Sequence, residues 1–152
     1  MTAITGKKSA FGAILKADAL AGDSAGTYRT VAYIQSLKGP GLKVDVAEVT
    51  THDSTSAYEE FVATVIRSGE ITVELVYDPG DVTIKYSNGL LGKMVAKTLE
   101  GFKIVFYDDT VEGSRTTWLF NAYIIGYEVS APHDGALTAT MKLKISGAPT
   151  LV

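Results

Sequence analysis

Alternation of apolar and polar side chains, the pattern of a strand in a half-buried sheet, runs through most of this sequence. It is clearest at residues 136–146, where apolar residues at every second position alternate with threonine, lysine or serine. The same pattern predicts further strands at 28–37, 43–50, 70–78, 102–106, 116–122 and 123–130. Gly39, Pro40 and Gly41 separate the first two of these, which predicts that 28–37 and 43–50 pair as an antiparallel hairpin.

The segment 51–69 is too long for a hairpin turn, because hairpin loops usually span about two to five residues. Loops of that length are usually functional or disordered, so we interpret this one as the working part of the chain. Its apolar residues are spaced three to four apart, as on one face of a helix: Tyr58, Phe61, Val62, Val65 and Ile66. Local rules therefore allow a short helix at 56–67 or an extended loop.

A second helical pattern occupies residues 86–98, with Asn88 as a candidate N-cap and Gly101 beyond its end. Residues 1–27 are rich in Ala, Gly, Ser and Thr without a sustained period. They predict an N-terminal arm that orders against another surface, or a frayed terminus. The resulting organisation is one mainly β domain at 28–147 and a short tail at 148–152. Its expected fold is a β-sandwich or curved antiparallel sheet with one flanking α-helix.

Composition narrows the class of protein without identifying it. The chain has 152 residues, 46% of them hydrophobic and 20% charged, which suits a single globular domain. It has no cysteine, so thiolate catalysis and thiolate metal sites are excluded. A formal net charge of -3 argues against nucleic-acid binding. No apolar run approaches the roughly eighteen residues of a membrane span, and the stretch at 10–15 is short for a signal peptide.

Candidate catalytic and metal-binding residues are few. His52 and His133 each lie beside an aspartate in a polar segment, without the spacing that would bring three metal ligands together. His52, Asp53 and Ser54 are consecutive, so they cannot form the relay of a catalytic triad. The pairs at 59–60 and 108–109 are neighbouring carboxylates that face different ways on a strand or helix. We therefore expect no enzyme, no metal and no cofactor.

Four segments in register resemble the major tail tube proteins of long-tailed, non-contractile bacteriophages, the lambda-like tail tube family. They read LKVDVAEVTTHDST, GEITVELVYDP, FKIVFYDDT and SAPHDGALTATMKLKISGAPT, and the likeness covers residues 30–150. The resemblance implies a structural subunit that assembles as hexameric rings, with a β-barrel shared between subunits, stacked into a tube. DNA would pass through the lumen during ejection without specific binding. The expected partners are tape measure, tail tip and terminator proteins, in a virion tail assembled in the host bacterial cytoplasm and without a membrane.

The resemblance also assigns roles to residues. Segments 28–50 and 70–78 would be lumen strands, whose polar faces offer Asp45, Glu74, Lys43 and Arg29. Segment 51–69 matches the ring-stacking loop, with the candidate contacts His52, Asp53, Tyr58, Phe61, Val65 and Ile66. The alternatives are a tube subunit of a contractile injection or secretion system, a ligand-binding β-sandwich module and, more distantly, a hydrolase.

Overall fold

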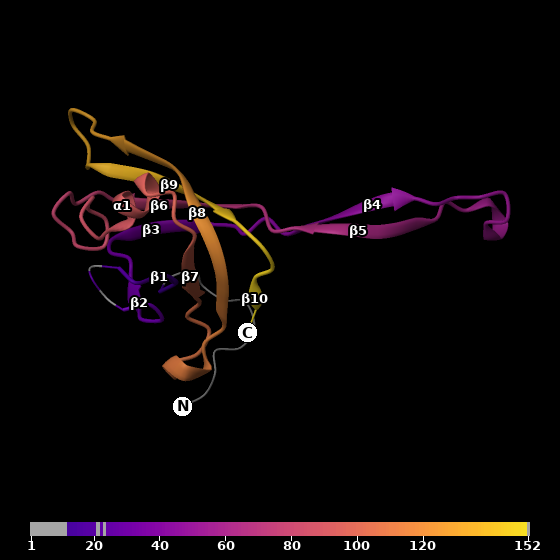
Figure 1. Ribbon diagram of the computed structural model, residues 1–152, viewed down its shortest axis with the longest axis horizontal. Helices are drawn as coiled ribbons and strands as arrows, with labels where there is room; N and C mark the ends of the chain where they lie inside the picture. The colour runs from indigo at the N-terminus through magenta and orange to yellow at the C-terminus, as the bar shows by residue number, and fades with distance from the viewer. Residues whose placement is uncertain (1–11, 21, 23, 152) are drawn as a thin grey trace.

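The computed structural model describes residues 12–20, 22 and 24–151, and strands dominate it (Figure 1). The strands are β1 (Ile14–Asp18), β2 (Tyr28–Thr30), β3 (Ile34–Lys38), β4 (Lys43–Glu48), β5 (Phe61–Arg67), β6 (Glu70–Val76), β7 (Glu100–Val105), β8 (Thr117–Ser130), β9 (Thr138–Ile145) and β10 (Thr150–Leu151). The helical elements are α1 (Leu90–Val95) and the short 3-10 turns η1 (Thr55–Ala57) and η2 (Glu112–Ser114). The predicted mainly β fold with an α-helix is confirmed.

The main sheet is antiparallel and curved. Its order over the described residues is β2-β1-β7-β8-β9-β6-β3, with β10 beside β8. Strand β8 lets the sheet curve, because its first part pairs with β7, its second part pairs with β9, and its register shifts between Ile124 and Gly126. A hollow is lined by Ile34 and Leu37 from β3 and by Ile104 from β7, so the sheet curves enough to bring the edge strand β3 near β7.

The core lies on the concave side of this sheet and follows the period-two pattern of the sequence. Ile71, Val73 and Leu75 of β6 are buried, and they alternate with more exposed neighbours. The buried faces of β7 and β8 meet where Phe102 stacks on Phe120 at a ring-centroid distance of 5.8 Å. Burial of these side chains fixes which face of each strand points inward, because a one-residue slip would expose them.

A long hairpin, which we call the arm (residues 43–67), projects away from the main sheet (Figure 1). It consists of β4 and β5 paired with each other and of η1 near its tip. Strand β3 leads into β4 and pairs with β6, and β5 leads into β6. The arm therefore continues the β3–β6 pair beyond the body of the molecule.

The predicted hairpin between 28–37 and 43–50 is wrong. Tyr33 has a φ of 60°, and the chain forms β2 and β3 as separate strands on either side of it. Residues 39–42 do not reverse the chain, so β3 and β4 both run against the β5–β6 segment. A Gly-Pro-Gly sequence marks a break between strands, and here that break is a bend in a ribbon and not a hairpin turn.

The helix considered at 56–67 is also wrong, because residues 61–67 form strand β5. The sequence Phe-Val-Ala-Thr-Val-Ile is rich in β-branched residues, which favour strands. A short helix also needs tertiary packing, and every residue of β5 is exposed in this chain. The helix predicted at 86–98 exists but is shorter, because Asn88 and Lys97, both with positive φ, lie just outside it.

The first and last strands of the described chain take part in the sheet. Strand β1 pairs with β2 and β7, and Leu15, Ala17 and Leu20 are fully buried. The N-terminal arm predicted at 1–27 is therefore wrong for these residues, whose strand is too short to give a sustained period. Residues 1–11, 21 and 23 of that prediction lie outside the described residues. In the predicted tail at 148–152, β10 pairs with β8.

Candidate assembly surfaces

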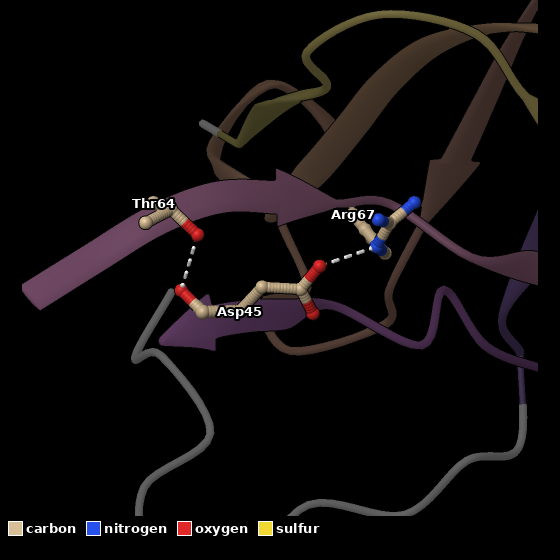
Figure 2. Close-up of polar contacts among 3 residues, drawn as sticks. All are labelled: Asp45, Thr64 and Arg67. Carbon is tan, nitrogen blue, oxygen red and sulfur yellow. Dashed lines mark hydrogen bonds and ion pairs between the residues drawn. The ribbon is translucent and has the colours of Figure 1, made fainter. Parts of the chain in front are cut away.

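The two strands of the arm are joined by a polar clip near its root (Figure 2). The Arg67 Nε donates a hydrogen bond to Asp45 Oδ2 at 2.7 Å, and the Thr64 hydroxyl donates one to the carbonyl oxygen of Asp45 at 3.1 Å. The register shifts between Val44 and Val46, so β5 carries a bulge opposite Asp45. The clip holds the bulge and lies on the same face as Lys43, which is the cross-strand partner of Arg67.

The opposite face of the arm is apolar. Its cross-strand pairs are Val44 with Ile66, Val46 with Ala63, and Glu48 with Phe61. Val44, Val46, Phe61 and Ile66 are 49%, 61%, 54% and 71% exposed. We call this surface the apolar arm face. Exposed apolar patches are features by which protein, membrane or ligand interaction sites are recognised, so this face is a candidate interaction surface.

The arm tip contains the other predicted stacking residues. His52 and Asp53 lie in the turn before η1, and Tyr58 follows η1 with its side chain exposed. The structure brings Phe61 and Ile66 onto the apolar arm face and leaves Val65 in the bulge. Val44 and Val46, which complete that face, were missing from the predicted set. The alternation of Val44 and Val46 with Asp45 indicates that the two valines share one strand face, but the resemblance places that strand in the lumen.

A second candidate surface is the part of the main sheet that has open edges. We call it the open-edged half: β3, β6, β9 and residues 123–130 of β8. Strand β7 pairs with β8 only as far as Ala122. Among the described residues, therefore, no strand pairs with the far side of 123–130 or with the far side of β3. Unpaired strand edges are templates for pairing with another chain.

The exposed face of the open-edged half carries charges of both signs. Glu70 of β6 lies opposite Lys144 of β9, with 3.9 Å between the charged atoms. The Ser36 hydroxyl donates a hydrogen bond to Glu74 Oε2 at 3.2 Å. The exposed charged residues that share this face in the described chain are Lys38, Glu70, Glu74, Glu128, Lys142 and Lys144. Cations and carboxylates are therefore balanced on it.

The predicted lumen residues do not share one surface. Glu74 belongs to the exposed face of the open-edged half. Lys43 and Asp45 belong to the arm, and Arg29 lies in β2 at the other end of the main sheet. Lys43 and Asp45 lie away from Glu74 because β4 pairs with β5 in the arm and not with a strand of the main sheet.

The part of the chain that the structure describes shows no cluster of potential metal ligands. No group of three or more His, Asp or Glu side chains there could hold a metal ion. None of its helices is long and apolar enough to cross a membrane. Burial raises the pKa of Tyr127 to about 12, with a smaller contribution from Tyr77 beside it. Burial and then the Asp18 carboxylate raise the pKa of Tyr28.

Comparison with solved structures identifies the fold. The tail of an empty gene transfer agent particle, solved with C6 symmetry, is similar with a TM-score of 0.72 at 13% identity, over 96% of this chain and 99% of that chain. The tube-terminating cap of the anti-feeding prophage is similar with a TM-score of 0.70 at 12% identity, over 100% of this chain and 95% of that chain. The SPP1 tail tube is similar with a TM-score of 0.62 at 15% identity, over 91% of this chain and 75% of that chain.

The chain matches no curated protein sequence. Residues 16–152 match the lambda phage tail tube protein family. This match extends through the main sheet and the arm, so it includes both candidate surfaces. The chain therefore belongs to the lambda phage tail tube protein family and is a structural subunit of a phage tail tube.

Proposed function

We propose that six copies of this chain join edge to edge into a ring, and that rings stack into a tube whose lumen conducts DNA during ejection. The observation that carries the proposal is the pair of open edges on the open-edged half. Pairing β3 of one copy with residues 123–130 of the next would remove both edges. The result would be a β-barrel shared by every copy of the ring.

Strand direction supports this closure. Along the open-edged half, β3, β6, β9 and β8 each pair antiparallel with the next. Strands at the two edges therefore run in opposite directions. Rotation about a ring axis preserves direction, so β8 of one copy meets β3 of the next in the same antiparallel sense as every other pair. The contact is heterologous, and a heterologous contact closes into a ring when the rotation between neighbours divides a full turn evenly.

The charges of the open-edged half suit a channel for DNA. Its exposed face would line the lumen, with Glu74 as one of the lining residues. Binding to DNA draws its affinity from cations that neutralise phosphates. On this face carboxylates balance the lysines, so a DNA chain would find no excess positive charge to hold it. The lumen role predicted for Lys43, Asp45 and Arg29 is not part of this proposal.

The arm is the proposed ring-stacking element. It continues β3 and β6, and strands of a closed barrel are inclined by only about 35–45° to its axis, so the arm would leave the ring toward a neighbouring ring. Tape measure, tail tip and terminator proteins are the further partners proposed, with assembly in the host cytoplasm. The tube of a contractile injection system shares the fold, and the match to the lambda family favours the non-contractile tail.

Electron microscopy of the purified chain tests the proposal. Negative-stain images of the wild type should show rings with a central hole and tubes made of them. Replacing Phe61→Ser together with Ile66→Ser should leave the monomer's thermal unfolding unchanged, because both side chains are exposed in one copy. The same variant should give rings but no long tubes, because it removes apolar area from the arm.

A matched control is Val49→Ser with Val62→Ser, which removes exposed apolar side chains outside the apolar arm face. It should stack better than the Phe61 and Ile66 variant. A wild type that stays monomeric at every concentration and with a tail-tip initiator would contradict the proposed function. A fall in the unfolding temperature of the Phe61 and Ile66 variant would place those residues in a core.

A further inference from the structure

We propose that the arm docks its apolar face on a defined surface around α1 of a copy in the neighbouring ring. We call this the α1 surface: the apolar side chains Val82, Tyr86, Val95 and Leu99 with Lys85, Lys93 and Lys97. The inference rests on the proposed function, because it names the partner surface for the arm in a stacked tube.

The α1 surface exposes several large apolar side chains, although a solvent-facing surface is usually polar. Val82, Tyr86, Val95 and Leu99 are 42%, 67%, 54% and 43% exposed. The segment that carries them is compact, since the amides of Leu90 and Leu91 donate hydrogen bonds to the carbonyls of Thr83 and Ile84. The side of the segment that faces the core is already used, because Ile84 and Leu90 are fully buried. The exposed apolar side chains are additional to what folding needs.

The two surfaces have opposite charge. Beyond Lys43 and Arg67 at its root, the arm contains Asp45, Glu48, Asp53, Glu59 and Glu60 and no other lysine or arginine. Between residues 82 and 99 the α1 segment contains Lys85, Lys93 and Lys97 and no aspartate or glutamate. The outer arm therefore carries only negative charges and the α1 segment only positive ones, whereas the exposed face of the open-edged half carries both signs. Complementary potentials of this kind select a partner and fix its register.

One charge on each surface is already paired within one copy, and the others are left for the contact. Asp45 is bound to Arg67 on the polar face of the arm, which leaves the other four carboxylates toward its outer part. Lys93 forms an ion pair with Glu100 at 3.4 Å, and Lys97 is exposed. Glu48 is the cross-strand partner of Phe61 on the apolar arm face itself. A carboxylate therefore lies within the apolar patch that would meet a lysine-bordered one.

The arrangement of the chain makes this contact one between copies. In Figure 1 the arm extends from one end of the body and α1 lies at the opposite end of the same long axis. Each side of the arm has about twelve residues from root to tip and reaches at most on the order of 40 Å, at roughly 3.3 Å per extended residue, so the arm can cross a junction between bodies. Equal spacing of copies then presents each arm to the α1 end of the next, as a head-to-tail contact.

Cysteine cross-linking tests the face of the arm that docks. The natural chain has no cysteine, so engineered thiols report without background. Tubes of Phe61→Cys, Val95→Cys should give covalent dimers and longer chains with a short bis-maleimide reagent. The matched control is Val62→Cys with Val95→Cys, because Val62 is the next residue of β5 and lies on the opposite face. The expected yield is at least several-fold higher for Phe61 than for Val62.

Charge reversal tests the partner surface independently. Glu59→Lys, Glu60→Lys should form rings but lose tubes, and Lys85→Glu, Lys97→Glu should do the same. Combining all four substitutions in one chain should restore tubes. Asp134→Lys serves as the control for a charge reversal away from both surfaces, because Asp134 is exposed in the turn between β8 and β9; it should form tubes of normal length.

The outcomes separate this inference from the proposed function. Tubes of normal length from both charge-reversed variants would overturn the inference and leave the tube itself intact. Equal cross-linking from Phe61 and Val62, or none from either in well-formed tubes, would also overturn it. A wild type that forms neither rings nor tubes would overturn the proposed function, and the inference with it.

Discussion

Tyr127 shows how a single buried hydroxyl in the sheet makes stability depend on pH. Its ring packs edge to face on Tyr77, with centroids 6.0 Å apart. Its hydroxyl oxygen is buried and, within the described part of the chain, has no hydrogen-bond partner. Burial disfavours the phenolate, which is why the pKa of Tyr127 is raised from 10.0 to about 12. The folded chain therefore retains this proton at a pH where the unfolded chain releases it.

The substitution Tyr127→Phe should flatten the alkaline stability curve. For a raised pKa, the stabilisation is complete below pH 10 and is lost as pH rises toward 12, because the unfolded state then binds fewer protons. Phe lacks this titration. At neutral pH the variant should equal the wild type or exceed it by up to about 1 kcal/mol in free energy of unfolding, because an unpaired buried hydroxyl is removed.

Urea unfolding of wild type and variant at a series of pH values measures the difference. Tyr123→Phe is the control, because Tyr123 lies on the exposed side of the same strand. Its curve should follow the wild type. An unchanged slope above pH 10 in Tyr127→Phe would contradict the argument.

Among the elements, those with one buried face were predictable from the sequence. Strands β6 and β9 match the predicted runs 70–78 and 136–146, because their alternation reflects a core on one side only. The arm was not predictable in the same way, since β5 buries nothing in its own chain and its apolar spacing fits a helix or a strand. What decides its form is β-branching and pairing with β4. The pairing partner of β4 depends on a bend at 39–42 that no local pattern specifies.

The root of the arm depends on backbone conformation. Gly69 has a φ of 74°, and a Cβ there would lie 2.6 Å from the carbonyl oxygen of Gly41. We expect Gly69→Ala to lower the free energy of unfolding by about 1–3 kcal/mol, because the left-handed conformation and the contact both penalise a side chain. Gly41→Ala is the matched control, since a Cβ there meets nothing within 4 Å.

Urea denaturation followed by far-UV circular dichroism gives both values. The Gly41 variant should lie within about 0.5 kcal/mol of the wild type, as surface changes usually do. Equal stability of the two variants would mean that the arm root tolerates a shift of its backbone. Their tubes, imaged under the same conditions, would then show whether the direction of the arm had changed.

At the scale of the whole molecule, the body and the arm differ in what they contribute. The body contains the core, and the arm exposes its side chains to solvent in a single copy. The body closes its core with help from β1, which contributes Leu15 and Ala17, and its open-edged half keeps two edges for neighbours. The arm contributes no buried residue from β5 and so adds little to the stability of one copy. The length of segment 51–69 predicted a working part of the chain there, and its residues lie in the arm. The sequence pattern did not predict the open edges or the apolar arm face, because edges and faces are defined only once distant strands have paired.

Hydrogen exchange on assembly tests the edge pairing without any substitution. Backbone amides that gain a strand partner exchange more slowly, since they must open before exchange. Passing from monomer to tube, peptides that cover 34–38 and 123–130 should gain at least tenfold protection. Strand β9 is the internal control, because it is already paired on both sides by β6 and β8. Its protection should change less than that of the two edges. Rings whose edge peptides exchange as fast as those of the monomer would show that the copies associate through faces, and the shared barrel would have to be abandoned.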